Sequence, residues 1–226
     1  ELFGLYDRVS GMTGTASSVA HEFWQLYRLR VCRIPTHRPS QRIALAPQSF
    51  QSVDERWAAV VEDVAAKRAD GRPVLIGTRT ITQSQQLSEL LTERDIPHEV
   101  LNALNHEEEA SIISDAGLPQ RVTVATNMAG RGTDICLQGD AESNGGLHVI
   151  CVEPQSAARI DRQLAGRCGR QGDPGSFQQF LSPEDEVLKE AGVDQKTTEA
   201  ESSSLSQLIR RAHAAVERRH TEQRSI

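Results

Sequence analysis

The fold of this sequence is decided by two stretches rich in arginine and glycine, Thr126-Asn-Met-Ala-Gly-Arg-Gly-Thr-Asp134 and Gln163-Leu-Ala-Gly-Arg-Cys-Gly-Arg-Gln-Gly-Asp-Pro-Gly175. The first follows the strand-like run 122–125, and the second comes shortly after the strand-like run 147–152. Glycine permits positive φ and close backbone approach, while arginine offers a planar, always-charged fork that suits phosphate oxygens. Two such loops beside predicted strands indicate a site for a nucleotide phosphate.

Strands and helices alternate on both sides of these loops. Short apolar runs predict strands, and leucine or alanine stripes predict the helices between them. The predicted strands are 73–77, 98–101, 121–125, 147–152 and 177–181, and the predicted helices are 83–94, 106–114 and 156–167. Such alternation predicts an α/β fold with a mostly parallel sheet covered by helices.

The flanking segments differ from this alternating core. An amphipathic helix is predicted over 52–68, with Gly71 ending it as a C-cap glycine. The proline-rich stretch 35–47 is interpreted as a connector between two bodies. After a polar stretch at 191–204, a helix with an apolar stripe runs toward the chain end. We expect this stripe to have no partner within the chain, and assign the helix to a truncated neighbouring domain.

Composition and charge limit the class of protein that this chain can be. The chain has 226 residues, 38% hydrophobic and 25% charged, as is ordinary for a globular protein. No apolar run approaches the roughly 20 residues of a membrane span, and no signal peptide is recognisable. A net charge of −6 argues against a surface that coats nucleic acid. The chain begins at Glu1 without a methionine, so we expect a fragment of a longer protein. The scattered cysteines indicate reduced thiols and no metal site.

The first loop offers a basic and an acidic candidate. Arg131, flanked by Gly130 and Gly132, could reach a γ-phosphate, because ligands of parallel sheets sit beyond the carboxyl ends of strands. Asp134 could bind a ribose hydroxyl, bind water or orient an arginine. The alternative is a flexible glycine-rich turn with solvated charges.

The second loop carries two further arginines. Arg159, Gln163 and Arg167 are spaced four apart, which predicts one shared helical face, and Arg167 and Arg170 lie on either side of Gly169. An arginine there could stabilise charge that develops on a phosphoryl group in the transition state. The alternative is a basic helix end that complements its own dipole.

Two parts of a complete nucleotide site are missing from the sequence. No Gly-x-x-x-x-Gly-Lys-Ser/Thr loop occurs to cradle phosphates, and no Asp-Glu pair ends an apolar strand to hold magnesium. Another domain must therefore supply the phosphate pocket, while this chain supplies arginines.

Taken together, the motifs resemble the second motor domain of the SecA family of preprotein translocases. The resemblance covers residues 2–188 and, more weakly, the start of a long scaffold helix at 207–224. Besides the two loops it rests on Ser10-Gly-Met-Thr-Gly-Thr-Ala16, Ile34-Pro-Thr-His-Arg-Pro39, Val74-Leu-Ile-Gly-Thr78, Leu101-Asn-Ala-Leu-Asn-His106, Gly145-Gly-Leu-His-Val-Ile150 and Leu181-Ser-Pro-Glu-Asp185.

The resemblance implies two RecA-like domains with ATP between them. The first would hold the phosphate loop and Mg²⁺, and the second would supply arginine fingers. The implied fold is a RecA-like three-layer domain. The implied boundaries are 1–33 for the end of the first motor domain, 34–190 for the second, and 191–226 for a linker and the scaffold helix. The implied catalytic residues are Arg167 and Arg170, and the implied nucleotide-site residues are Arg131, Gly132, Asp134 and Gln171.

The resemblance further implies ATP-driven export of unfolded preproteins through the SecYEG channel. The protein would be cytoplasmic and peripheral at the inner face of the plasma membrane, with no nucleic-acid partner and with a homodimer as one form of the full-length protein. Departures from the family pattern at His37, Leu104 and Cys168 are compatible with a divergent or accessory member. Two alternatives stay open: a superfamily-2 nucleic-acid helicase that uses the same arginines, and a non-catalytic module that docks on another motor.

Overall fold

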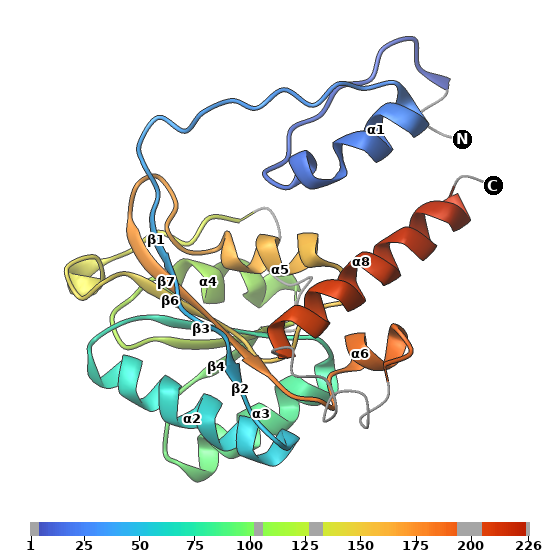
Figure 1. Ribbon diagram of the computed structural model, residues 1–226. Helices are drawn as coiled ribbons and strands as arrows, with labels where there is room; N and C mark the ends of the chain where they lie inside the picture. Colours follow the sequence, from blue (N-terminus) through green and yellow to red (C-terminus); the bar gives the residue numbers. More distant parts are fainter. Residues whose placement is uncertain (1–4, 102–105, 127–132, 194–204, 225–226) are drawn as a thin grey trace.

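A computed structural model describes residues 5–101, 106–126, 133–193 and 205–224, with the backbone alone for 106–110 and 220–224. Figure 1 shows the arrangement. In chain order the elements are η2 (Ala16–Val19), α1 (Ala20–Tyr27), β1 (Gln41–Ala44), β2 (Gln48–Ser49), α2 (Val53–Ala69), β3 (Val74–Thr78), α3 (Ile81–Glu93), β4 (Glu99–Leu101), α4 (His106–Asp115), β5 (Val122–Thr126), η3 (Gly139–Ala141), β6 (Leu147–Cys151), α5 (Ala158–Ala165), β7 (Pro174–Leu181), α6 (Glu186–Glu190) and α8 (Leu205–Arg224).

The strands form one parallel sheet in the order β1-β7-β6-β3-β5-β4, with β2 pairing beside β7. Parallel neighbours need crossover connections, and helices supply them. Helices α2 and α3 cover one face of the sheet, and α4 and α5 cover the other (Figure 1). The predicted α/β class and the three-layer arrangement expected of a RecA-like domain are therefore confirmed.

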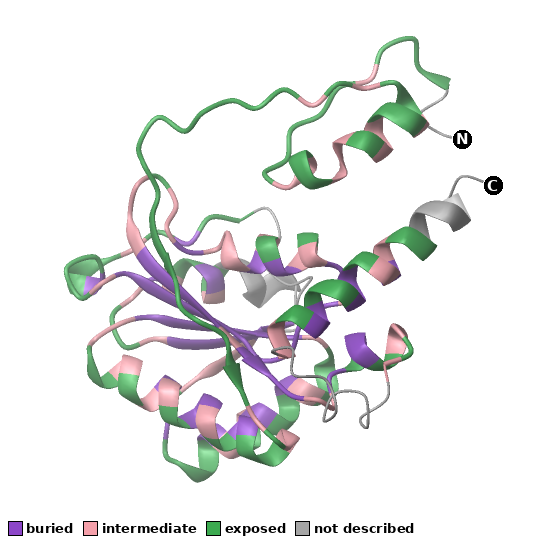
Figure 2. Ribbon diagram, in the orientation of Figure 1, coloured by how far each residue is buried: buried purple, intermediate pink, exposed green. Residues whose placement is uncertain are grey.

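The central strands are buried on both faces, as Figure 2 shows. Val74 and Ile76 of β3 pack toward α2 and α3, while Leu75 between them packs with Ile113 of α4 and Leu164 of α5. Burial on both faces explains why these strands appear in the sequence as continuous apolar runs without polar alternation.

Local signals place the helices close to where the sequence predicts them. Helix α2 begins after Ser52, whose hydroxyl accepts a hydrogen bond from the Glu55 amide at 3.2 Å. Helix α3 begins after Thr80, which caps Gln83 in the same way at 3.1 Å. Gly71, with φ 79°, follows the end of α2 in the left-handed region.

The stretch 35–47 is not a simple connector, and this prediction is wrong in part. Strand β1 lies within it and pairs with β7 from Gln41 opposite Pro174 to Ala44 opposite Phe177. All of β1 is exposed, because it forms the outer edge of the sheet. A strand that buries neither face has no hydrophobic period for a sequence pattern to detect.

The expectation that the stripe of α8 has no partner within the chain is also wrong. Leu208, Ile209 and Ala212 are buried against Leu181 at the end of β7 and Leu188 of α6. The assignment of the helix to a neighbouring domain stays a prediction. None of the helices in the described ranges combines the length and apolar character that a membrane span needs.

Candidate functional site

The last residues of the first loop, Thr133 and Asp134, lie beside the second loop, and the carboxylate of Asp134 joins the two segments. Arg170 Nη1 donates to Asp134 Oδ1 at 2.7 Å, and Gln171 Nε2 donates to Asp134 Oδ2 at 2.9 Å. Asp134 lies in the segment that follows β5, and the two donors lie in the loop between α5 and β7. The fold thus brings together predicted site residues that are 36 and 37 positions apart in sequence.

A backbone carbonyl holds both candidate finger arginines. Arg167 Nη1 donates to Thr133 O at 3.3 Å, and Arg170 Nη1 donates to the same oxygen at 3.4 Å. Arg170 Nε donates to Gly166 O at 2.8 Å, so its guanidinium is fixed from two sides. Thr133 and Gly166 contribute only backbone atoms here, and no side-chain pattern could reveal that role.

Arg167 lies outside the helix that was predicted to carry it. Helix α5 ends at Ala165 and Gly166 forms its C-cap, so Arg167 does not share a helical face with Arg159 and Gln163. The prediction fails because the last turn tightens: the Arg167 amide donates to Leu164 O, three residues earlier, at 2.9 Å, so the α-helical spacing does not extend to Arg167. Arg131 and Gly132 lie outside the described residues.

Asp134 serves as the counter-ion of the arginine loop. Partial burial acts to raise the pKa of Asp134, but hydrogen bonds from Arg170 and Gln171 outweigh it, and the pKa lies below its ordinary value. The carboxylate is therefore ionised at neutral pH. Of the three roles predicted for Asp134, the described contacts correspond to orienting an arginine.

A cavity of about 690 Å³ opens beside this loop between α4, α5 and the sheet. Its basic lining residues are Arg42, Arg162, Arg167 and Arg170, and no acidic residue of the described chain lines it. The remaining lining is mainly apolar or backbone. Four guanidinium groups around one hollow favour an anion, and their planar forks match phosphate oxygens.

The described residues suit a phosphate better than a metal ion. Within the described ranges, no group of three His, Cys, Asp or Glu side chains could hold a metal. Asp134, the acidic residue at the end of the first loop, is already paired with Arg170 and Gln171. Any Mg²⁺ that accompanies a nucleotide would need ligands from outside this group of residues.

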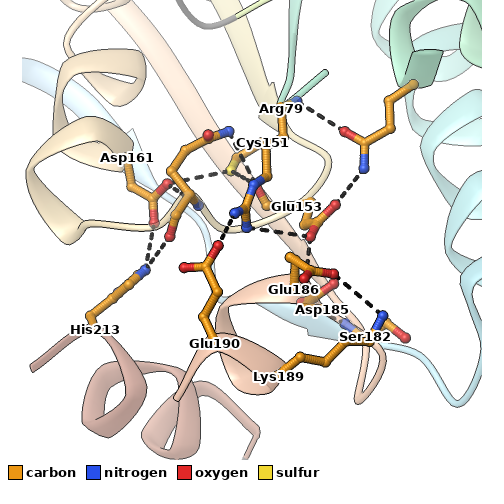
Figure 3. Close-up of polar contacts among 12 residues, drawn as sticks. Arg79, Cys151, Glu153, Asp161, Ser182, Asp185, Glu186, Lys189, Glu190 and His213 are labelled. Carbon is orange, nitrogen blue, oxygen red and sulfur yellow. Dashed lines mark hydrogen bonds and ion pairs between the residues drawn. The ribbon is translucent and has the colours of Figure 1, made fainter. Parts of the chain in front are cut away.

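A second polar cluster, which the sequence interpretation missed, lies beyond the carboxyl ends of β3, β6 and β7 (Figure 3). Glu153 accepts hydrogen bonds from the Glu186 amide at 2.9 Å and from Gln83 Nε2, and it lies 3.9 Å from Arg79 Nη1. Arg79 also pairs with Glu190 of α6. The cluster fastens α6 to the sheet. The one sign of this cluster in the sequence is Glu153, a charged residue directly after the apolar run 147–152.

Helix α8 joins this cluster through His213. His213 Nε2 lies 2.7 Å from Gln155 O and 3.8 Å from Asp161 Oδ2. Because a carbonyl oxygen only accepts, Nε2 carries the hydrogen of this bond. Burial lowers the pKa of His213, and burial raises the pKa of Asp161 to about 7.

The raised pKa of Asp161 predicts a pH-dependent stability. The folded state holds the proton of Asp161 more tightly than the unfolded chain, so this contribution falls as the pH rises from about 4 through 7. Replacing Asp161 with asparagine should remove that fall, which amounts to at most roughly 4 kcal/mol between pH 4 and pH 8. Urea unfolding of the chain and the variant across this range measures the difference.

The control is Asp95→Asn, because Asp95 is exposed and has a positive φ that asparagine tolerates. Its unfolding free energy relative to the unsubstituted chain is measured over the same pH range. A difference for Asp161→Asn that does not vary with pH would contradict the assignment of this pH dependence to Asp161.

Comparisons with known proteins agree with the geometry. The family model described as the SecA P-loop domain matches residues 39–144 and 140–207. A protein translocase subunit SecA 2 from Rhodopirellula baltica is 50% identical over 236 aligned residues, covering 100% of this chain and 36% of the relative. A SecA 2 from Magnetococcus marinus is 52% identical over an alignment that covers 83% of this chain and 29% of the relative. A SecA from Flavobacterium psychrophilum is 50% identical over an alignment that covers 85% of this chain and 17% of the relative.

Two solved helicase structures resemble the chain in outline. The Escherichia coli DEAD-box protein SrmB, solved with the regulator RraA, has a TM-score of 0.49 at 18% identity, covering 71% of this chain and 87% of that one. Domain 2 of the DEAD-box helicase Mss116p has a TM-score of 0.49 at 18% identity, and the match covers 68% of this chain and 60% of that one. The chain spans 17% to 36% of the length of the three SecA relatives described above. With most of its length matched by the family model, the chain belongs to the SecA P-loop domain family.

Proposed function

We propose that this chain is the second motor domain of an ATP-driven protein translocase, and that it supplies arginine fingers to an ATP site shared with a first motor domain. The observation that carries the proposal is the arginine loop itself. Arg167 and Arg170 are held on Thr133 and Asp134 at the rim of a cavity that four arginines line. Family membership supports the same function.

The proposed chemistry is positional and electrostatic. The first motor domain holds ATP and Mg²⁺, and closure of the two domains brings Arg167 and Arg170 to the γ-phosphate. Asp134 holds Arg170 until closure, when phosphate oxygens replace its carboxylate as the acceptor. Arg131 and Asp134 are proposed to couple the nucleotide state to domain movement, and Gly132 and Gln171 are proposed as further residues of the nucleotide site.

The proposed boundaries are 1–33 for the end of the first motor domain, 34–190 for the second and 191–226 for the linker and scaffold helix. The exposed apolar side chains before β1 support the first boundary. Leu5, Met12 and Ile34 are 81%, 99% and 81% exposed, and helix α1 has no buried residue. Such surface suits residues that pack against another part of a longer protein.

In the longer protein, hydrolysis would drive unfolded preproteins through the SecYEG channel from the cytoplasmic side of the plasma membrane. The protein would act without a nucleic-acid partner and would form a homodimer in one of its states. It would be a divergent or accessory member of the family. Each of these partners follows from family membership and the proposed motor role.

The test is the ATPase activity of the 226-residue chain alone. Because the sequence lacks a phosphate loop, we expect turnover indistinguishable from buffer and weak nucleotide affinity. A parent protein that carries both motor domains, assayed under the same conditions, is the positive control. Robust turnover by the uncontaminated chain would contradict the shared site.

A further inference from the structure

The segment 38–42, which leads into β1, lies against the loop of residues 166–173, called here the arginine loop. Gln41 Nε2 donates to Gly172 O at 2.5 Å, and Arg42 Nη1 donates to Ala165 O at 3.1 Å, just before the loop. The pairing of β1 with β7 then begins at Pro174, the first residue after the loop. The segment therefore contacts the arginine loop at both of its ends.

Two glycines let the backbone of the loop approach this segment closely. Gly169 has φ 64°, and a Cβ there would lie 2.5 Å from Arg42 Cβ. Gly172 has φ 90°, and a Cβ there would lie 2.9 Å from Arg38 Cδ. At both positions the backbone is left-handed and packs directly against segment 38–42. Each position therefore requires glycine for two reasons, its φ and the lack of space for a Cβ.

The arginine loop also contacts Thr133 and Asp134, described above. Two separate parts of the chain therefore hold the loop, the segment that follows β5 and segment 38–42. Strand β1 is exposed along its whole length, so its pairing buries no core. Arg42 lines the same cavity as Arg167 and Arg170.

We infer that Gln41 and Arg42 are positioning residues that hold the arginine loop in the orientation the fingers need. The inference rests on the proposed function. Since residues 1–33 are proposed to end the first motor domain, segment 38–42 lies just after the domain boundary and links the first domain covalently to the arginine loop's neighbouring strand. A movement of the first domain therefore reaches the finger loop directly through this link, as well as across the nucleotide.

The test is a double-mutant cycle in a parent protein that carries both motor domains. Arg42→Ala should lower kcat for ATP by about 10-fold to 100-fold, because misplacing a catalytic group by about an ångström has an effect of this size. The KM for ATP should change by less than about 3-fold, since the first domain holds the ground-state nucleotide. In an Arg170→Ala background, Arg42→Ala should cause little further loss.

The control variant is Arg33→Ala, which removes the same charge from an exposed position that precedes segment 38–42. It should leave kcat unchanged. A second readout is amide hydrogen exchange in the 226-residue chain, where Arg42→Ala and Gln41→Ala should speed exchange in residues 166–173 and leave β3 protected. This readout also covers the case in which a substituted parent fails to fold.

The outcomes separate the two proposals. If Arg167→Ala and Arg170→Ala both keep full turnover, the proposed function fails, whatever Arg42 does. If Arg170→Ala abolishes turnover but Arg42→Ala has no effect, or if Arg42→Ala has the same effect in both backgrounds, the positioning role is overturned and the proposed function stands. Unchanged exchange in residues 166–173 would also overturn the positioning role.

Discussion

Replacing Arg170 by alanine in a parent protein with both motor domains is expected to slow ATP turnover by about 10³-fold or more. Arg170 is chosen because the positions of its acceptors are known: Asp134, Thr133 and Gly166 all accept hydrogen bonds from its guanidinium. A guanidinium that is oriented before closure exchanges Asp134 for phosphate oxygens on closure, and then needs little further reorganisation when charge develops on the phosphoryl group. Phosphate release at saturating ATP measures the effect.

Arg94→Ala is the matched control for this loss. Arg94 forms an exposed pair with Glu62 and follows α3, on the face of the sheet opposite α5. Turnover of this variant should stay within about 2-fold of the unsubstituted parent, in keeping with the small effects of exposed ion pairs. Near-normal turnover by both Arg167→Ala and Arg170→Ala would remove the arginine loop from the mechanism.

Replacing Arg56 by alanine is expected to destabilise this chain by about 3–5 kcal/mol. Arg56 of α2 pairs with Asp185, and the two side chains are 3% and 0% exposed. Asp185 also accepts the Ser182 amide at 3.0 Å, so the pair ties α2 to the turn after β7. Without Arg56, a buried carboxylate loses its counter-ion. Urea unfolding followed by circular dichroism measures the change in unfolding free energy.

Arg94→Ala again provides the comparison, now for stability. The Arg94–Glu62 pair spans 3.6 Å, with side chains 53% and 71% exposed, and its loss should cost less than about 1 kcal/mol. Comparing the buried Arg56 with the exposed Arg94 tests whether burial of the ion pair causes the larger loss of stability. A loss below about 1 kcal/mol for Arg56→Ala would contradict it.

The sequence predicted the central fold because its signals there are local. Strands β3, β5 and β6 are short apolar runs, and Ser52 and Gly71 mark the two ends of α2. The edge strand β1 gave no such signal, since its residues are exposed on both faces. The stripe of α8 was detected, but its partners in α6 and β7 depend on a chain path that periodicity cannot supply.

The sequence could indicate candidate residues for the site, but it could not indicate the contacts between them. The wording of the two loops identified Asp134, Arg167, Arg170 and Gln171, and the structure brings these together. The supporting carbonyl of Thr133 has no side-chain signature. The contacts of Arg42 join positions 123 apart in sequence, and only the parallel pairing of β1 with β7 creates them.

The central claim is that Arg167 and Arg170 complete an ATP site at the transition state. The most direct test compares the affinity of the Arg170→Ala parent for ATP and for ADP with aluminium fluoride, which mimics the phosphoryl group in transfer. We predict that ATP affinity changes by less than about 3-fold, while affinity for the mimic falls by about the same factor as turnover. Equal losses for both ligands, or none for the mimic, would contradict the claim.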